Sequence, residues 1–525
     1  MIRSFETHVV RRQEELTEKL WMFSPLQGER AGEVFPVMTP SCWETYPGFG
    51  LYRGQGCYLT HFFGGGNIRL ECKGVSHTAE VWLDGKRLCE HYNAYTAFSA
   101  VARNLERGEH ELKIVADNRF TTQSALHVPN DYMSYGGISR PVVVEEVDSA
   151  YLERMHLTPR REGEGWRVHI SLRICNLQES GELSLSVAIG GQELRFPPQI
   201  FPLGESTAEG DLIFHDAKAW SPETPVLYTA SARLFRGSRA IDDLIERFGF
   251  REIKTDGKQI LLNGAPLRIK GLCRHEDHPQ YGCAVPPAAM AYDLGLIRDL
   301  GANSVQTAHY PNDERFLDLC DELGILVWEE NHARGLSVEQ MQNANFEKQA
   351  EQVIREMTEQ HYNHPSVYIW GILNECASDS EFGKQCYQRQ FALLRELDQS
   401  RPCSFASCKF KTDICFGLPD VVSYNIYPKW YHDTPPKEYL ADLYDWIQRE
   451  TEGAGKPFLV TEIGAGGLYG YRRRTKQNGA RSFSAARSGN SSKRFYLSPN
   501  VQASISGSFR TYASAKSGGA AALAR

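Results

Sequence analysis

Seven short apolar runs, separated by longer helical stretches, follow one another from about residue 250 onward. Helical stretches such as Glu314–Leu323 and Phe346–His361 lie between them. Strands that alternate with helices in this way form parallel sheets. Seven such units predict a (β/α)8 TIM barrel that is incomplete at its eighth unit. The strand candidates are Leu267–Gly271, Ser304–Thr307, Ile325–Trp328, Val367–Leu373, Ser404–Ala406, Val421–Ile426 and Phe458–Thr461.

The first 250 residues follow a different pattern, with short alternating strands joined by Gly, Asp and Asn turns. Asp84-Gly85 is a hairpin signal. Trp166–Leu172 alternates apolar and polar residues with period two, as a half-buried strand must. We therefore predict an antiparallel β-sandwich over residues 1–148 and a second, immunoglobulin-like sandwich over residues 149–250. The barrel would follow over residues 251–472.

Length and composition exclude several classes of protein. A chain of 525 residues is too long for one ordinary domain, and we expect about two to four. The net charge of −7 argues against a nucleic-acid partner. No run of about 18 apolar residues predicts a membrane span, and the start lacks the apolar core of a signal peptide, which favours a cytoplasmic protein. The 13 cysteines form no zinc-finger pairs, so reduced and mostly buried thiols are the favoured interpretation.

Two of the predicted strands end in a glutamate, Glu375 after Trp370–Asn374 and Glu462 after Phe458–Thr461. A carboxylate at the end of a buried strand is costly unless it has a task. Active sites of barrels lie at the carboxyl ends of the strands, where both glutamates would sit. One such glutamate alone would more often be structural. The pair, with an amide residue before Glu375, instead indicates the two carboxyl groups of a glycosidase.

The residue types suggest a role for each group. A retaining glycosidase needs two carboxyl groups about 5–5.5 Å apart, which facing barrel strands can supply. Glu375 would be the general acid and base, and Glu462 the nucleophile. Asn374 would hydrogen-bond the sugar hydroxyl next to the reacting carbon. Tyr427, at the end of the sixth strand, would hydrogen-bond Glu462, although a lone tyrosine there is more often a core residue.

Three other strand ends carry polar side chains. His275 and His278 follow the first strand and raise the alternative of a metal hydrolase. Neighbouring positions on a strand point in different directions, however, so we prefer His275 as a sugar contact and expect no metal and no cofactor. His309 closes the second strand in a similar way. Glu329 and Glu330 end the third strand; we expect Glu330 to line the pocket, while one of the two is structural.

Several motifs together resemble glycoside hydrolase family 2, the β-galactosidase and β-glucuronidase family. The likeness covers roughly residues 30 to 470. It implies a jelly-roll, sugar-binding-like first domain, an immunoglobulin-like domain and a catalytic TIM barrel, with Glu375 as acid/base and Glu462 as nucleophile. The matching segments are Trp220–Pro225, Phe248–Arg251, Leu262–Gly264, Gly271–His278, His309–Pro311, Asn363–Ser366, Asn374-Glu375 and Thr461-Glu462.

Within this family, Asn425–Tyr431, which contains the candidate sugar contact Trp430, is more similar to the β-glucuronidases. Asn130-Asp131-Tyr132 also resembles a glucuronidase loop that sends an aspartate into the sugar pocket, although Asp131 can equally be a turn residue. The uronate-selecting Asn-x-Lys element of that group is absent. We expect an exo-acting retaining β-glycosidase, a β-glucuronidase in the first place. A β-galactosidase and a carbohydrate-binding pseudoenzyme remain alternatives, and a homo-oligomer is left open.

The last 53 residues do not fit this resemblance. Residues 473–525 contain ten Lys and Arg, eleven Ser and no Asp or Glu, which leaves 48 basic and 65 acidic side chains elsewhere, a balance of −17. We predict an aberrant, basic and disordered tail. A reading-frame slip between about Tyr471 and Lys476 explains it better than a natural basic tail. Synonymous codons for Ser504–Phe509, read from the third base, spell Tyr-Leu-Trp-Gln-Phe, similar to the family's eighth strand; sequencing the gene tests this.

Overall fold

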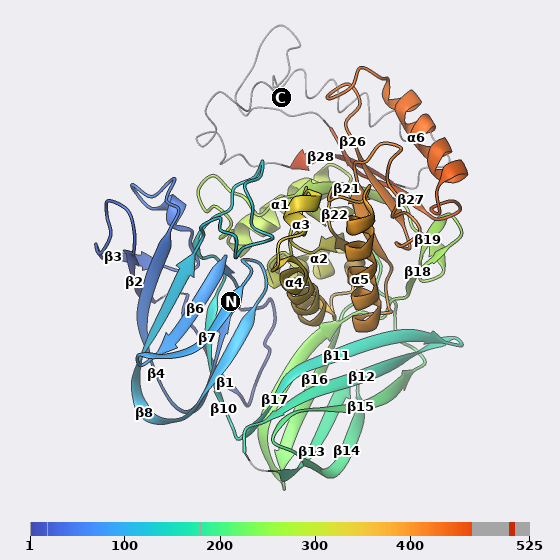
Figure 1. Ribbon diagram of the computed structural model, residues 1–525. Helices are drawn as coiled ribbons and strands as arrows, with labels where there is room; N and C mark the ends of the chain where they lie inside the picture. Colours follow the sequence, from blue (N-terminus) through green and yellow to red (C-terminus); the bar gives the residue numbers. More distant parts are fainter. Residues whose placement is uncertain (1, 18, 179, 465–502, 510–525) are drawn as a thin grey trace.

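The computed structural model describes residues 2–17, 19–178, 180–464 and 503–509, the last stretch by its backbone alone. Two β-sandwiches pack against a barrel (Figure 1). The first sandwich, in blue, lies to one side of the barrel, and the second, in teal and green, lies beneath it in this view. Among the described residues, no helix is long and apolar enough to cross a membrane.

The first sandwich is an eight-stranded antiparallel sheet: six strands follow the order β1-β10-β4-β8-β6-β7, β2 also pairs with β4, and β3 pairs with β2. Asp84 and Gly85 both have positive φ, 48° and 74°, between β6 and β7, which confirms the predicted hairpin. The buried core contains Trp21, Trp43 and Tyr58. The strands are β1 (Arg12–Glu15), β2 (Leu20–Pro25), β3 (Phe35–Met38), β4 (Gln55–Cys72), β6 (Thr78–Leu83), β7 (Lys86–Tyr92), β8 (Phe98–Asp117) and β10 (Val142–Val147), with a separate pair β5 (Val75–Ser76) and β9 (Gly137–Ile138).

The second sandwich has two facing sheets, β11-β12-β15 and β14-β13-β16-β17. Trp166, Val168, Ile170 and Leu172 of β12 point into its core, as the period of two predicted. This confirms the expected all-β unit. The strands are β11 (Ala150–Glu162), β12 (Gly165–Asn176), β13 (Gly181–Ile189), β14 (Gln192–Phe201), β15 (Gly204–Phe214), β16 (Tyr228–Arg236) and β17 (Arg239–Phe248).

The barrel follows a small sheet of β18 (Ile253–Asp256), β19 (Gln259–Leu262) and β20 (Ala265–Pro266). Every side chain of β22 to β27 is buried, because helices or the barrel interior cover both faces of a parallel sheet. All seven predicted strands are present. They are β21 (Ile269–Arg274), β22 (Ser304–Thr307), β23 (Leu326–Glu330), β24 (Val367–Ile372), β25 (Cys403–Ser407), β26 (Val422–Ile426) and β27 (Phe458–Ile463). The helices are α1 (Pro287–Asp299), α2 (Glu314–Leu323), α3 (Val338–Met341), α4 (Phe346–His361), α5 (Glu381–Leu397) and α6 (Pro436–Glu450).

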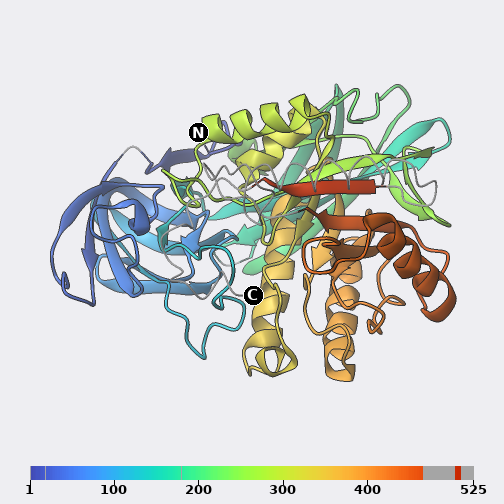
Figure 2. The same cartoon turned by 90° about the horizontal axis from the view of Figure 1, so that it is seen from above.

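The eighth strand position is occupied, whereas we expected a barrel that is incomplete at its eighth unit. β28 (Ala503–Phe509) pairs in parallel with β21 and with β27 and closes the barrel. Figure 2 shows β28, in red, among the barrel elements. Backbone groups of almost any sequence can pair with the two strand edges, so this place does not require the side chains of the family's strand. The remainder of the tail, including the predicted disorder and any eighth helix, lies outside the described residues.

The first residues of the chain connect all three parts of the molecule. Arg3 donates two hydrogen bonds, of 2.8 and 3.0 Å, to Asp318 on α2 of the barrel. Arg11 donates to Asp242 on β17 of the second sandwich at 2.8 Å, and to Glu145 on β10 of the first at 3.2 Å. All five side chains are buried. We call these two arginines and their three carboxylate partners the clamp.

Contacts between aromatic rings join the first sandwich to the barrel. The ring centroids of His77 and His127 are 4.4 Å apart, those of His127 and His332 are 4.2 Å apart, and those of Tyr95 and Tyr310 are 3.9 Å apart. Burial lowers the pKa of His77 to about 4 and that of His332 to about 3. Burial, followed by the neighbouring histidines, also lowers the pKa of His127. These imidazoles are therefore neutral at physiological pH.

These buried histidines predict a loss of stability in mild acid. A histidine of the unfolded chain takes up a proton near pH 6.5, whereas the folded pKa values of His77 and His332 are about 4 and about 3. Between these values the unfolded state binds more protons, so the free energy of unfolding falls as the pH is lowered through 6.5. Urea titrations at about pH 7.5, 6.5 and 5.5 measure the slope. A His77→Gln variant should lose stability less steeply, and equal slopes for the two proteins would contradict this explanation.

Candidate active site

The carboxyl ends of four barrel strands bring together a small set of polar side chains. Glu330 ends β23, Glu375 follows β24, Tyr427 follows β26, and Glu462 lies within β27. Glu330 and Glu462 are buried and Glu375 is half-buried. Side chains at these ends share one rim of a parallel barrel, which is where such folds perform chemistry.

A strained turn positions Glu375. Leu373 and Glu375 have positive φ values of 46° and 56°, an uncommon conformation that costs about 1–3 kcal/mol per residue and needs fixed surroundings. Those surroundings are present, because the Glu375 amide donates to the Ala406 carbonyl at 2.8 Å and the Leu373 amide donates to the Asn331 side chain at 3.1 Å. The turn directs the Glu375 carboxylate toward β26, where Asn425 donates to it at 3.0 Å.

Glu462 has two neighbours that the sequence predicted to lie in the site. The Tyr427 hydroxyl donates a hydrogen bond to Glu462 Oε2, as predicted. His309 Nε2 lies 3.7 Å from Oε1 of the same carboxylate. Burial, and then the charge of Glu375, raise the pKa of Glu462 to about 8, and the hydrogen bond from Tyr427 opposes this rise without cancelling it. The two glutamates are therefore close enough to influence each other's charge.

Glu330 is linked to the same centre through His309. Its carboxylate accepts from Trp328 at 2.9 Å and from Gln306 at 3.1 Å, and it shares a 2.7 Å hydrogen bond with His309 Nδ1. Burial raises its pKa to about 8. His309 thus lies between Glu330 and Glu462. Its hydrogen bond to Glu330 orients the imidazole ring toward Glu462.

Glu329 points into the scaffold instead. It accepts from the Asn312 amide at 3.2 Å and shares a 2.9 Å hydrogen bond with His361. This agrees with the expectation that one of the two neighbouring glutamates is structural. Successive residues of a strand face opposite sides, so only one of them can reach the site.

His275 and His278 are separated by the structure. The His275 ring lies beside Tyr132 and His309, with centroids 5.2 and 5.3 Å away. His278 stacks on Tyr281 at 4.7 Å, outside this group. The two histidines therefore do not form the joint metal site that was considered as an alternative.

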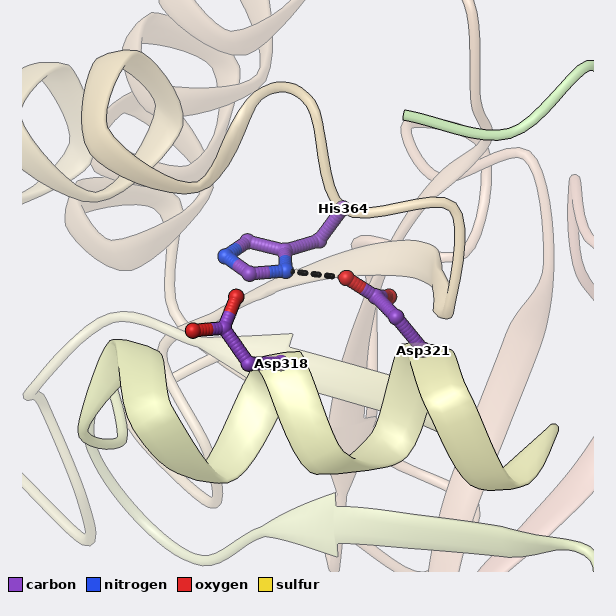
Figure 3. Close-up of side chains that lie close together, drawn as sticks. All are labelled: Asp318, Asp321 and His364. Carbon is purple, nitrogen blue, oxygen red and sulfur yellow. Dashed lines mark hydrogen bonds and ion pairs between the residues drawn. The ribbon is translucent and has the colours of Figure 1, made fainter. Parts of the chain in front are cut away.

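Asp318, Asp321 and His364 are a cluster whose residue types suit a metal ion (Figure 3). His364 Nδ1 lies 2.5 Å from Asp321 Oδ2, and the Ser366 amide donates to the other oxygen at 3.0 Å. The Arg3 guanidinium already bonds both oxygens of Asp318. Asp318 thus already has a cation as its partner, and it belongs to the clamp.

Arg334 is a site residue that the sequence did not reveal. It lies in the loop after β23, and its guanidinium forms ion pairs with Asp131 at 2.9 Å and with Glu375 at 3.5 Å. Asp131 comes from the first sandwich, so Arg334 connects that domain to the catalytic rim. No strand-end pattern marks this loop position, and an isolated arginine carries no signal in the sequence.

Trp430 and Asn374 were also predicted to contact the substrate. The ring centroids of Trp430 and Tyr431 are 6.4 Å apart, and those of Tyr431 and Tyr427 are 5.6 Å apart, so Trp430 lies near the end of β26. Among the described residues, the buried Nδ2 of Asn374 has no hydrogen-bond partner. A buried polar atom of this kind fits a group that meets a ligand.

Comparison with known proteins gives consistent matches. A family described as "Glycosyl hydrolases family 2, TIM barrel domain" matches residues 252–477, and one described as "Glycosyl hydrolases family 2" matches residues 150–251. A β-glucuronidase of Streptococcus agalactiae is 28% identical over 440 residues, which cover 75% of this chain and 71% of the relative. A β-galactosidase of Thermoanaerobacterium thermosulfurigenes is 29% identical over 424 residues, 77% of this chain and 56% of the relative.

One solved structure is much more similar. It is the crystal structure of a GH2 β-galacturonidase from Eisenbergiella tayi bound to galacturonate, which is 53% identical to this chain. The match covers 96% of this chain and 91% of that chain, with a TM-score of 0.94. The likeness extends over both sandwiches and the barrel.

Proposed function

The chain belongs to glycoside hydrolase family 2, and we propose that it releases terminal β-linked uronic acids by a retaining mechanism. As a member of this family it is a glycoside hydrolase, and its partner is a carbohydrate. The proposed substrate is a β-galacturonide. The 53% identity to a β-galacturonidase bound to galacturonate is the observation that supports this choice.

A β-glucuronide is the second candidate. Its support comes from relatives named β-glucuronidase and from the glucuronidase-like segment Asn425–Tyr431, the basis of our expectation from the sequence. Glucuronate and galacturonate are epimers that differ at carbon 4 alone, and both carry the same carboxylate. The more similar relative therefore changes our order of preference between two sugars of one class.

The mechanism follows from the two glutamates. Glu375 donates a proton to the glycosidic oxygen while Glu462 attacks the anomeric carbon, and the leaving group departs as an alcohol. Glu375 then removes a proton from water, and this water attacks the same carbon and releases Glu462. Tyr427 and His309 hold the Glu462 carboxylate, and Asn374 offers its free amide to the sugar. Two inversions leave the product with the configuration of the substrate.

A uronic acid brings a negative charge to a rim that already holds Glu330, Glu375 and Glu462. Arg334 is a cation in contact with this rim, and it supplies positive charge for an anionic sugar. Its ion pair with Asp131 is half-exposed, so an incoming carboxylate or hydroxyl can share its donors. The site thus combines a two-carboxyl centre with a counter-charge for the substrate.

Hydrolysis of p-nitrophenyl β-D-galacturonide, β-D-glucuronide and β-D-galactoside tests the proposed function. We expect the galacturonide to give the highest kcat/KM, and NMR to detect the β-anomer of the sugar first. A faster reaction with the neutral galactoside would refute the uronide class, and an initial α-anomer would refute retention. A protein that binds galacturonate without hydrolysing any of the three would be the pseudoenzyme considered above.

Arg334→Gln should selectively weaken the binding of the anionic sugar. Hydrogen bonds to charged groups contribute about 1.5–3 kcal/mol, so we expect the inhibition constant of galacturonate to rise roughly tenfold to a hundredfold. Galactose, which lacks the carboxylate, should bind almost equally to both proteins. Arg389→Gln, at an exposed pair with Glu347, is the matched control. Equal weakening of the two sugars would mean that Arg334 does not act through charge.

The value of kcat/KM should fall as the pH rises through about 8, which gives the pH profile a falling limb. Burial and the charge of Glu375 raise the pKa of Glu462 to about 8, so below that pH the facing pair shares one proton, and this proton has to be on Glu375 when Glu462 attacks. The first step needs one proton for the leaving group and one ionised carboxylate, and it stops when that proton is lost. Plotting kcat/KM from about pH 5 to pH 10 measures the limb. Glu330→Gln removes a carboxylate that also raises this pKa, so it should move the limb slightly to lower pH; a flat profile up to pH 10 would contradict the assignment.

A further inference from the structure

Two buried cysteines from different domains face each other. Cys42 directly precedes the short 3-10 helix η1 (Trp43–Thr45) of the first sandwich, and Cys283 lies in the loop between β21 and α1 of the barrel. Their sulfur atoms are 3.4 Å apart and form a hydrogen bond between the two thiols. All 13 cysteines of the chain are free thiols, so this contact joins two domains without a covalent bond.

Backbone hydrogen bonds fix the position of Cys42. Its neighbours Ser41 and Trp43 donate from their amides to the carbonyls of Ile138 and Gly136, at 2.8 and 3.0 Å. The two acceptors belong to β9 and to the residue before it. Both flanks of Cys42 are therefore held within the first sandwich, and its side chain is directed at the barrel loop.

Gly282 makes room for the Cys42 sulfur. Its φ of 57° lies in the left-handed region, which favours glycine. A Cβ atom at this position would lie 3.0 Å from Cys42 Sγ and 2.8 Å from the Tyr135 ring, so a side chain here would collide with both. The glycine thus lets the sulfur of Cys42 reach its partner at the next position, Cys283.

The two thiols are enclosed by apolar side chains. Cys42, Tyr135, Cys283 and Ala284 form one buried cluster, against which the half-buried Met133 packs. Burial, followed by the hydrogen bond with Cys283, raises the pKa of the Cys42 thiol, so this thiol keeps its proton at neutral pH. Cys42 is 0% exposed and Cys283 is 7% exposed, so an oxidant of the size of water reaches Cys283 first.

We propose that Cys42 and Cys283 are an oxidisable pair that forms a disulfide between the first sandwich and the barrel. The oxidant is hydrogen peroxide. The sulfur of Cys283 attacks one peroxide oxygen, the O–O bond breaks, and a sulfenic acid and one water form. The sulfur of Cys42 then attacks the sulfenic sulfur and the S–O bond breaks. The departing hydroxide takes the Cys42 proton and becomes a second water, so the two thiols have lost two electrons to the peroxide.

This disulfide would connect positions that are 241 residues apart in the chain. A disulfide bond is about 2.05 Å long, so the two sulfurs have to approach by only about 1.3 Å. A bond that closes so long a segment restricts the unfolded chain, and the melting temperature should rise by about 3–8 °C. The inference concerns the interface between the domains, and it does not depend on which sugar the enzyme releases.

Peptide mapping of the full chain tests the proposal. Trypsin, which cuts after Lys and Arg, gives the peptides 31–53 and 275–298, in which Cys42 and Cys283 are the only cysteines. After treatment with hydrogen peroxide and alkylation of the remaining thiols, we expect a species with the summed mass of the two peptides minus two hydrogens. Dithiothreitol should separate it. Two unlinked peptides, or Cys42 linked to a different cysteine, would overturn the proposal.

Variants separate this disulfide from other oxidation. Cys283→Ser should abolish both the linked species and the rise in melting temperature, and Cys42→Ala should do the same if the serine disturbs folding. Cys408→Ser removes an exposed thiol and should keep both effects. An equal rise in melting temperature in peroxide-treated Cys283→Ser and wild type would show that another oxidation stabilises the protein, and would refute the role of this pair.

Discussion

Replacing Glu462 with glutamine is expected to stop hydrolysis, with kcat lowered about 10⁴-fold or more. A neutral amide cannot attack the anomeric carbon, so no covalent intermediate forms. Glu375→Gln should lower kcat/KM about 10²- to 10⁴-fold on substrates with a poor leaving group, and less on p-nitrophenyl glycosides, because p-nitrophenolate departs without a proton. Glu396→Gln changes an exposed glutamate of α5, and should behave as the wild type.

Rescue by azide distinguishes the two roles. In a Glu375→Ala variant, azide can attack the intermediate on Glu462 and give a β-glycosyl azide. In Glu462→Ala, azide takes the place of the nucleophile and gives the α-glycosyl azide. The opposite pair of products would exchange the assignments, and near wild-type activity in either variant would remove that residue from the mechanism.

Arg11→Leu is expected to have the largest effect on stability. The change leaves Asp242 buried without Arg11, while Glu145 keeps its pair with Arg69 at 2.8 Å, and breaking a buried pair such as Arg11–Asp242 costs about 3–5 kcal/mol. The free energy of unfolding in urea and the melting temperature should both fall. Because Arg11 bonds both sandwiches, its loss should also make the unfolding of the two sandwiches less cooperative.

Arg12→Leu is the matched control. Arg12 is the next residue, and its pair with Glu146, at 3.2 Å, is exposed to water. Surface pairs contribute about 0–1 kcal/mol, so this variant should differ little from the wild type. Similar losses in the two variants would mean that the stability resides in the segment rather than in the buried charges.

The barrel was predictable because of how its strands are buried. β24 and the start of β27 are apolar runs that leave little choice of structure, and β22 and α2 have the bounds that the sequence predicted. Glu375 and Glu462 were found in the same way, as charges at the ends of such runs. Tyr427 followed from its place at the end of β26.

The role of Arg334 and the contact between Cys42 and Cys283 were not predictable. Both depend on contacts between the first sandwich and the barrel, and local patterns contain no information on how domains pack. The upward shift in the pKa of Glu462 was missed for the same reason. It arises from burial and from a second carboxylate nearly ninety positions away in the chain.

The eighth strand differs from the prediction for another reason. Ser504–Phe509, the segment whose shifted reading resembles the family's strand, lies in β28 and pairs with both neighbours. The hydrogen bonds of a strand come from the backbone, so a segment without the side chains of the family's strand can still fill the eighth strand position. Whether the gene contains the frame slip stays a prediction, which its nucleotide sequence tests directly.

Arg3 and Arg11 leave the ribosome long before their partners exist. Asp318 follows Arg3 by 315 residues, and Asp242 follows Arg11 by 231. At roughly 5–20 residues per second, Arg3 waits about 15–60 s for the helix that will hold it. During that time the first sandwich can fold on its own, because the early domains of a nascent chain generally fold first. The first residues to be made are thus among the last to take their places, and they fasten three units that have already formed.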